Sequence, residues 1–289
     1  MKILHVAVFT PESTNVWQAD AFEELGCEVI RYDYRQRARD LDGGIHSINP
    51  NRDAELIEVC KRELPDLVLF SKCNKLHINV VKECNKVCKT ALWYMDPRGN
   101  IDGELIEKMK YCHYVFTSRW DAVRVAEKYN RNVYRIHEGY DPKVNKPFNI
   151  PKIRNVCFIG NLRSYRYAYY KEIKFDVVSN AFREEHAKIV SETKINLNFT
   201  EGDGTSDRTY KVLAAKGFLL TMPWENMEED FEVGEDLDIF TSPKNLKEQI
   251  EYYLIYDEER ERIAEHGYNT VKKYDNINYA RSILSVIGT

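Results

Sequence analysis

Short apolar runs alternate along the chain with segments of helical periodicity, and this alternation constrains the fold more than any other feature. Ile3–Phe9 and Leu67–Ser71 have the length and composition of buried strands, whereas Val16–Leu25 and Ala54–Glu63 have the spacing of helices. Strands that alternate with helices predict βαβ units, which assemble into a parallel sheet. The sequence therefore predicts an α/β protein of the Rossmann-like type.

A linker divides this pattern into two parts. Residues 141–151 contain three prolines and show no periodicity, and a strand-like run restarts at Val156–Gly160. A chain of 289 residues has the length of two domains. We therefore expect an N-terminal domain over residues 1–145 and a C-terminal domain over 146–289. After the strand-like Asp238–Phe240 only helical patterns follow, so we expect this tail to cross back to the first domain.

Composition excludes several classes of protein. With 43% hydrophobic and 30% charged residues, the chain is globular rather than disordered. Its apolar runs are only a few residues long, whereas a bilayer span needs about 20. Seven scattered cysteines suit a reducing compartment, so we expect a cytoplasmic protein. A net charge of −4 argues against a general nucleic-acid binder.

One local run is basic. Residues 31–39 interleave four arginines with Tyr32 and Tyr34. Such a run grips phosphate-bearing acceptors in some proteins. The favoured interpretation is a solvated loop that follows the second strand.

The first candidate site follows the strand-like Val156–Gly160. In an open parallel sheet, ligands bind outside the carboxyl ends of the strands, where helix N-termini attract phosphate. Gly160 lets the backbone approach a pyrophosphate, and Asn161, Arg163 and Arg166 follow it. Guanidinium groups bind phosphate in a bidentate manner. This strand end is therefore a candidate phosphate site.

A second candidate site follows the strand-like Ile195–Phe199. Asn198 leads into a glycine-rich segment over residues 200–205, and Ser206 or Asp207 is placed to cap the next helix. Arg208 lies in the first helical turn, where a cation is unfavourable unless an anion binds beside it. The chain contains neither GxGxxG nor GxxxxGK[ST], which disfavours dinucleotide dehydrogenases and P-loop kinases.

These segments resemble the C-terminal half of CgeB-like glycosyltransferases, which are relatives of the retaining group 1 enzymes. The matching segments are residues 191–200, 206–210 and 213–221, together with Trp93–Pro97, Glu138–Pro142 and Phe158–Asn161. The resemblance implies the GT-B fold, in which two Rossmann-like domains face each other across a cleft. It also implies a glycosyltransferase that moves a sugar from a nucleotide-diphosphate donor, with a UDP-sugar favoured.

The resemblance assigns roles to individual residues. We expect Arg163, Arg166 and Arg208 at the phosphates, with Arg208 catalytic. Asp96 is expected to contact the acceptor or handle its proton. The other expected donor contacts are Gly160, Asn161, Asn198, Asp207 and Lys211. We expect no cofactor and no metal, because helix N-termini and basic side chains neutralise the departing diphosphate.

Two departures from the family pattern leave alternatives open. Lys211 stands where the family has a glutamate that grips the donor ribose, and the interval from Gly160 to Ile195 is short by about one strand–helix unit. These departures motivate one alternative, a catalytically inactive GT-B-like binding module, and the same fold also supports a sugar-nucleotide epimerase. The acceptor stays open among a glycan, a protein, a small molecule and a modified nucleic-acid base.

Overall fold

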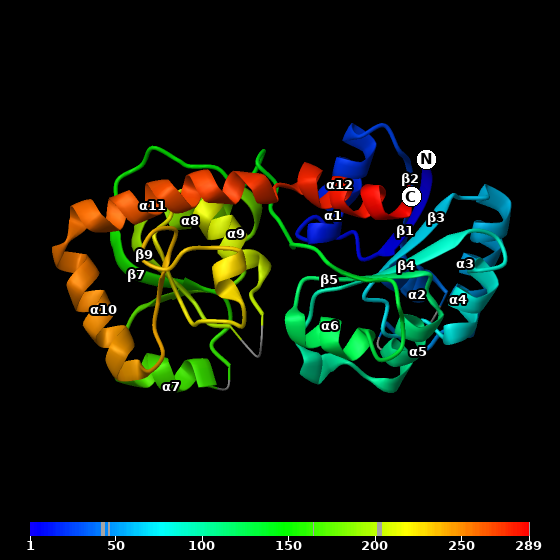
Figure 1. Ribbon diagram of the computed structural model, residues 1–289, viewed down its shortest axis with the longest axis horizontal. Helices are drawn as coiled ribbons and strands as arrows, with labels where there is room; N and C mark the ends of the chain where they lie inside the picture. Colours follow the sequence, from blue (N-terminus) through cyan, green and yellow to red (C-terminus); the bar gives the residue numbers. More distant parts are fainter. Residues whose placement is uncertain (42–43, 46, 164, 201–203, 289) are drawn as a thin grey trace. The chain divides into compact units, whose positions relative to one another are not determined.

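The structure, a computed structural model, describes residues 1–41, 44–45, 47–163, 165–200 and 204–288 (Figure 1). The chain forms two compact units. The N-terminal unit contains Met1–His137 and Asn276–Thr289, and the C-terminal unit contains Glu138–Asp275. In the described part of the chain, no helix combines the length and hydropathy that a bilayer span requires.

The N-terminal unit is built on six parallel strands in the order β2-β1-β3-β4-β5-β6. Successive side chains of a strand point to opposite faces, so Leu4 and Val6 pack on one face of the sheet and Ile3 on the other. The strands are β1 (Lys2–Ala7), β2 (Glu28–Asp33), β3 (Leu67–Ser71), β4 (Lys89–Tyr94), β5 (Tyr114–Thr117) and β6 (Val133–Arg135).

Helices cover the first face of this sheet and bury a continuous core (Figure 1). They are α2 (Tyr34–Asp40), α3 (Pro50–Glu63), α4 (Ile78–Cys84), α5 (Gly103–Tyr111) and α6 (Trp120–Ala126), with the short 3₁₀ turn η1 (Arg98–Asn100) before α5. Helices α3 to α6 each contribute buried side chains to this core, among them Leu56, Val80, Leu105 and Ala122.

The second face of the sheet is covered by α1 (Thr14–Glu24) and by the last helix, α12 (Asn276–Ile287). The Tyr279 ring of α12 contacts Trp17, Phe22 and Trp93 at centroid distances of 6.0, 6.2 and 5.3 Å. The predicted return of the C-terminal tail to the first domain is therefore confirmed, and α12 carries it.

The C-terminal unit has five parallel strands in the order β11-β10-β9-β7-β8. The strands are β7 (Arg154–Ile159), β8 (Asp176–Val178), β9 (Thr193–Asn198), β10 (Leu219–Thr221) and β11 (Asp238–Ile239). Among the described residues, the interval between β7 and β9 thus contains a single strand, β8. Because the strands are parallel, their carboxyl ends, where the candidate site residues lie, meet at one edge of the sheet.

Two cores lie on the two faces of this sheet. One packs α8 (Arg183–Ser191) and α9 (Asp207–Ala214) on the strands, and the other packs α7 (Tyr165–Glu172), α10 (Pro243–Ile255) and α11 (Asp257–Val271). The 3₁₀ turns η2 (Met227–Glu229) and η3 (Lys272–Tyr274) belong to the first core, through Met227 and Tyr274.

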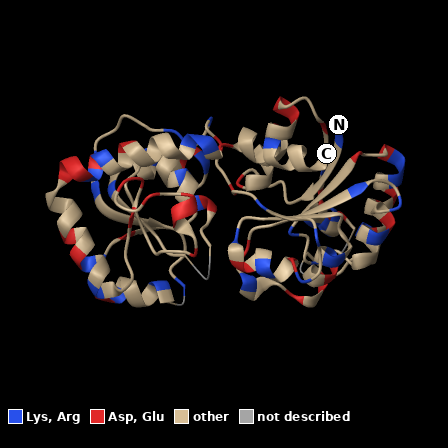
Figure 2. Ribbon diagram, viewed as in Figure 1, with Lys and Arg blue, Asp and Glu red and all other residues tan. Residues whose placement is uncertain are grey.

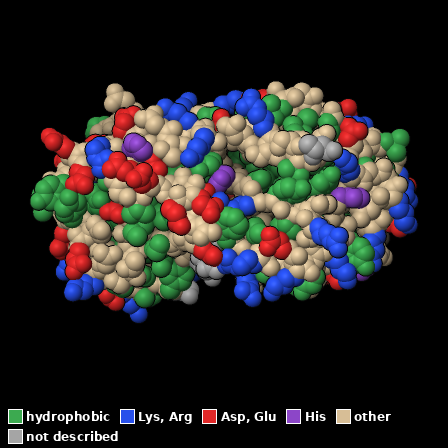
Figure 3. Space-filling view, in the orientation of Figure 1, with side chains coloured by type: hydrophobic (Ala, Val, Ile, Leu, Met, Phe, Trp, Pro, Cys, Tyr) green, Lys and Arg blue, Asp and Glu red, His purple; other side chains and the backbone are tan. Residues whose placement is uncertain are grey.

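Residues 31–39 do not form the predicted loop. They complete β2 and form α2, because the Asp33 carboxylate caps this helix by accepting hydrogen bonds from the backbone N–H groups of Arg35 and Gln36. Arg31 forms ion pairs with Asp20 and Glu23. Arg37 forms ion pairs with Asp40 and Glu55. Lys and Arg are likewise interspersed with Asp and Glu over both units (Figures 2 and 3). The loop prediction was therefore wrong.

Candidate functional site

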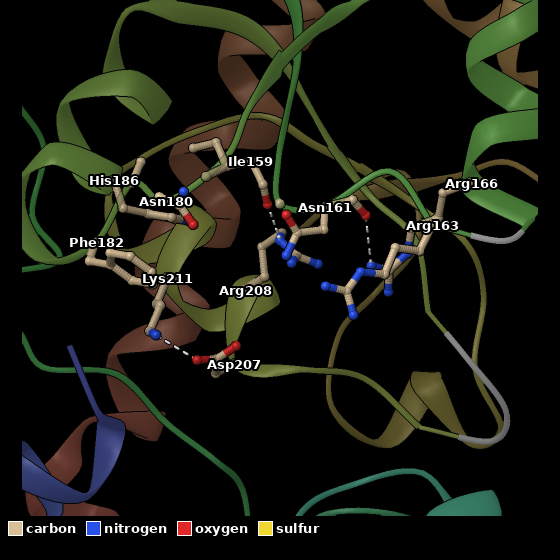
Figure 4. Close-up of a pocket in the computed structure, with 12 residues that line it drawn as sticks. Ile159, Asn161, Arg163, Arg166, Asn180, Phe182, His186, Asp207, Arg208 and Lys211 are labelled. Carbon is tan, nitrogen blue, oxygen red and sulfur yellow. Dashed lines mark hydrogen bonds and ion pairs between the residues drawn. The ribbon is translucent and has the colours of Figure 1, made fainter. Parts of the chain in front are cut away.

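The C-terminal unit contains a cavity of about 350 Å³ at the carboxyl ends of β7 and β8 and the N-termini of α8 and α9 (Figure 4). The structure brings together on its wall seven of the residues that the sequence singled out: Gly160, Asn161, Arg163, Arg166, Asp207, Arg208 and Lys211. The remaining lining residues are Ile159, Asn180, Ala181, Phe182 and His186.

Arg208 lies at the centre of the cavity wall (Figure 4). Its Nε donates a hydrogen bond to the Ile159 carbonyl oxygen at 2.8 Å, and its Nη1 donates to Asn198 Oδ1 at 2.8 Å. The guanidinium also lies over the Phe158 ring, 5.0 Å from its centroid. These contacts hold the cation in one orientation before any ligand arrives.

Asn198 is fully buried behind this wall and is absent from the described residues that line the cavity. Its amide Nδ2 donates to the hydroxyls of Thr209 and Thr221, both at 3.2 Å. The hydroxyls fix the amide so that Oδ1 points at Arg208. In the structure Asn198 thus positions Arg208, and a direct contact between Asn198 and a nucleotide stays a prediction.

Gly160 allows the strand end and Arg208 to approach each other closely. Its φ is +151°, and a Cβ atom there would lie 2.9 Å from Phe158 Cζ and 3.0 Å from Arg208 Nη2. Both neighbours are held in place, so a larger residue would displace the guanidinium or distort the strand end.

The cavity wall carries positive charge without matching carboxylates on one side. Within the described residues, no ion pair joins Arg163, Arg166 or Arg208 to a carboxylate. The Arg166 guanidinium shares the Phe158 ring with Arg208, at 5.6 Å from the centroid, which brings two like charges close together. Like charges that converge in this way favour the binding of an anion.

The N-terminus of α9 adds donors to the same end of the cavity. Its N-cap, Ser206, makes no capping hydrogen bond, and its buried Oγ has no hydrogen-bond partner among the described residues. Uncapped N–H groups at a helix N-terminus attract phosphate. In the adjoining glycine-rich segment, residues 201–203 lie outside the described residues.

Lys211 and Asp207 form an ion pair one helical turn apart on α9. Desolvation alone would raise the pKa of the Asp207 carboxyl, but the charge and hydrogen bond of Lys211, with the Arg208 charge, lower that pKa to about 2. The carboxylate is therefore ionised and neutralises Lys211. Asp207 supplies a carboxylate to the same wall on which Lys211 replaces the expected glutamate.

Sequence reasoning missed Asn180, Phe182 and His186. Asn180 and Phe182 follow β8 directly, so the rule of strand ends that selected Gly160 would also have found them. Phe182 is the N-cap of α8 and leaves 47% of its surface exposed. His186 lies one turn further along α8, and no sequence signal marked it.

Asp96 belongs to the N-terminal unit, where it follows β4. Its Oδ1 accepts a hydrogen bond from Lys72 Nζ at 2.7 Å. Lys72 and Cys73 follow β3 and both have positive φ, +61° and +54°. Consecutive left-handed residues other than glycine are uncommon, and they concentrate at functional sites.

The two parallel α/β sheets, one in each unit, are the architecture of the GT-B fold. Residues 148–285, slightly less than half of the chain, match the family model described as glycosyl transferase-like. The sequence of the chain matches none of the curated proteins.

Solved structures share the fold over nearly the whole chain. HepE of Anabaena, in complex with UDP-glucose, has a TM-score of 0.72 at 10% identity and covers 100% of this chain and 99% of its own. A glycosyltransferase of Rickettsia africae has a TM-score of 0.69 at 13% identity and covers 99% of this chain and 97% of its own. Sucrose-phosphate synthase of Thermosynechococcus elongatus has a TM-score of 0.70 at 9% identity and covers 99% of this chain and 98% of its own. The predicted GT-B fold is confirmed.

Proposed function

We propose that this protein is a glycosyltransferase that moves a sugar from a nucleotide-diphosphate donor, a UDP-sugar, to an acceptor hydroxyl, with retention of configuration and without a metal ion. The donor binds in the cavity of the C-terminal unit. The acceptor, whether a glycan, a protein, a small molecule or a modified nucleic-acid base, binds at the N-terminal unit. HepE, which has the same fold, was solved with UDP-glucose, and this supports the choice of donor.

The observation that carries the proposal is the group of three arginines at the ends of β7 and β9, which form no ion pair with any carboxylate among the described residues. Arg163, Arg166 and Arg208 converge on one side of the cavity, and the N-terminus of α9 faces the same end. A nucleoside diphosphate brings negative charge that matches this cluster, and guanidinium groups bind phosphate oxygens in a bidentate manner.

The same cluster supports catalysis as well as binding. When the bond between the sugar and the diphosphate breaks, negative charge grows on the leaving phosphate oxygen. Arg208 is already oriented by Ile159 and Asn198, so it stabilises this charge without reorganisation. Arg208 therefore fills the role that a metal ion has in other phosphate-releasing enzymes.

In the N-terminal unit, we assign the acceptor contact to Asp96. Lys72 holds one oxygen of this carboxylate, and a carboxylate accepts hydrogen bonds from more than one donor. An acceptor hydroxyl is a suitable second donor. Asp96→Asn should therefore reduce transfer while it leaves binding of UDP to the C-terminal unit unchanged, because Asp96 belongs to the other unit.

Isothermal titration calorimetry with UDP, GDP, ADP and TDP tests the donor site. Arg163→Ala should weaken binding of UDP by about 10- to 100-fold, since a hydrogen bond to a charged group contributes about 1.5–3 kcal/mol. Arg163 is exposed, so this variant should fold normally. The matched control is Arg262→Ala, which removes an arginine of the same unit that pairs with Glu235. Failure of every nucleotide to bind would refute the donor site.

Turnover distinguishes a transferase from the other GT-B proteins. Mass spectrometry of a reaction with UDP-glucose should reveal free UDP together with free or transferred glucose. An inactive binding module would release no UDP, and an epimerase would convert the donor without releasing it. Either result would contradict the proposed transfer.

A further inference from the structure

The cavity has two chemically different sides. Figure 4 places Arg163 and Arg166 on one side of Arg208, and His186, Asn180 and Phe182 on the other. The first side is cationic, and the second has neutral polar groups, an exposed aromatic ring and Lys211, whose charge Asp207 neutralises. The diphosphate accounts for the first side, so the second side must match another part of the ligand.

His186 is the least satisfied group on the second side. His186 exposes only 7% of its surface. Its ring nitrogen Nδ1 is buried and has no hydrogen-bond partner among the described residues. Nearly all buried polar groups in proteins have a partner, either in the protein or in a bound molecule. The residue lines the cavity, so a ligand bound there contacts the imidazole directly.

The imidazole is neutral. Burial, with help from the charges of Lys211 and Arg208, lowers the pKa of His186 to about 3. A neutral imidazole offers one N–H donor and one acceptor nitrogen. A hydroxyl group both donates and accepts a hydrogen bond, whereas a phosphate oxygen at neutral pH only accepts. The neutral ring therefore suits a hydroxyl better than a phosphate.

The position of His186 relates it to the sugar of the nucleoside. In a nucleotide the ribose connects the diphosphate to the base. Lys211 and Arg208 line the same cavity as His186, so His186 lies beside the phosphate end. Phe182, one helical turn before His186, offers its exposed ring to a base. A ribose that bridges these two ends lies at His186.

We propose that His186 binds a ribose hydroxyl of the donor nucleotide and makes the site select ribonucleotides over deoxyribonucleotides. This inference rests on the proposed function, since it requires a nucleoside diphosphate in the cavity. It assigns a specificity-determining contact to a helix that carries none of the predicted donor residues.

The test compares four ligands by calorimetry: UDP, 2′-deoxy-UDP, 3′-deoxy-UDP and inorganic pyrophosphate. The wild-type protein should bind UDP about 10-fold more tightly than at least one deoxy analogue, as expected for one lost hydrogen bond. His186→Ala should bind UDP as weakly as that analogue and should not discriminate between them. His186→Gln, which keeps a donor and an acceptor, should restore part of the discrimination.

Pyrophosphate separates this inference from the donor site itself. His186→Ala should bind pyrophosphate as the wild-type protein does, which also shows that the variant is folded, whereas Arg163→Ala should bind it more weakly. Equal wild-type affinity for UDP and both deoxy analogues would overturn the inference, as would discrimination that persists in His186→Ala. A parallel loss of pyrophosphate binding in a folded His186→Ala would identify a phosphate contact and overturn it too. If the wild-type protein binds neither UDP nor pyrophosphate, the proposed function fails first.

Discussion

Mild acid should destabilise both units through one buried histidine in each. His5 in the N-terminal unit is fully buried, and its Nε2 lies 2.9 Å from Ser71 Oγ. Burial, with the Arg31 charge, lowers the pKa of His5 from 6.5 to about 3. His186 in the C-terminal unit has a pKa that is lowered by the same amount, first by burial. Protonation of either ring therefore opposes folding.

The sign and size of the effect follow from proton linkage. Between pH 6.5 and pH 3, the unfolded chain binds a proton at each position and the folded chain does not. The stability is thus fully present above pH 6.5 and decreases as the pH falls through this window. At pH 5 each histidine should lower the free energy of unfolding of its unit by about 2 kcal/mol relative to pH 8. Carboxyl groups with ordinary pKa values are still mostly ionised at pH 5.

Urea denaturation of protein labelled with 5-fluorotryptophan resolves the two units. Trp17, Trp93 and Trp120 report on the N-terminal unit and Trp224 on the C-terminal unit, so ¹⁹F NMR follows each transition separately. His5→Gln should remove about 2 kcal/mol of the pH dependence from the N-terminal transition only, and His186→Gln the same amount from the C-terminal one. If either variant keeps the full pH dependence of its unit, the assigned histidine is not the cause.

Three further substitutions test other features. Gly160→Ala should weaken binding of UDP by about 10-fold or more in calorimetry, because the new Cβ would meet Phe158 and Arg208 at a positive φ; unchanged affinity would contradict this account. Tyr279→Phe should raise the free energy of unfolding of the N-terminal unit by about 1 kcal/mol in urea denaturation, since the buried hydroxyl has no hydrogen-bond partner among the described residues. A decrease would indicate a partner for that hydroxyl. Arg37→Ala should change the free energy of unfolding by less than about 1 kcal/mol and leave UDP binding intact, since its ion pairs are partly exposed.

The fold could be predicted from the sequence because strands that are buried on both faces consist almost entirely of apolar residues. Leu67–Ser71 is buried at every position and is also apolar at nearly every position. The cationic side of the cavity was accessible for a similar reason. Gly160 and Arg208 each follow a strand, and strand ends meet at one edge of a parallel sheet.

Other features depended on partners that are remote in sequence or unusual in type. The four arginines over residues 31–39 suggested a loop, so helix α2 and its N-cap Asp33 were not predicted. The carboxylates that neutralise Arg31 and Arg37 lie partly on α1 and α3, which are remote in sequence. His186 is distinguished because its Nδ1 has no hydrogen-bond partner in the described part of the chain, and only an assembled core can reveal this. The same holds for Asn198, whose role behind Arg208 depends on the hydroxyls of two other elements.

The location of α12 has a consequence for synthesis on the ribosome. The C-terminal unit is one continuous segment, so its sheet and helices can assemble as soon as residue 275 has emerged. The N-terminal unit is translated first, yet Trp17, Phe22 and Trp93 stay uncovered until Tyr279 and its helix arrive. The order in which the two units complete their folding is therefore the reverse of the order in which they are made. A premature stop near residue 275 would leave the second unit whole and the first one open.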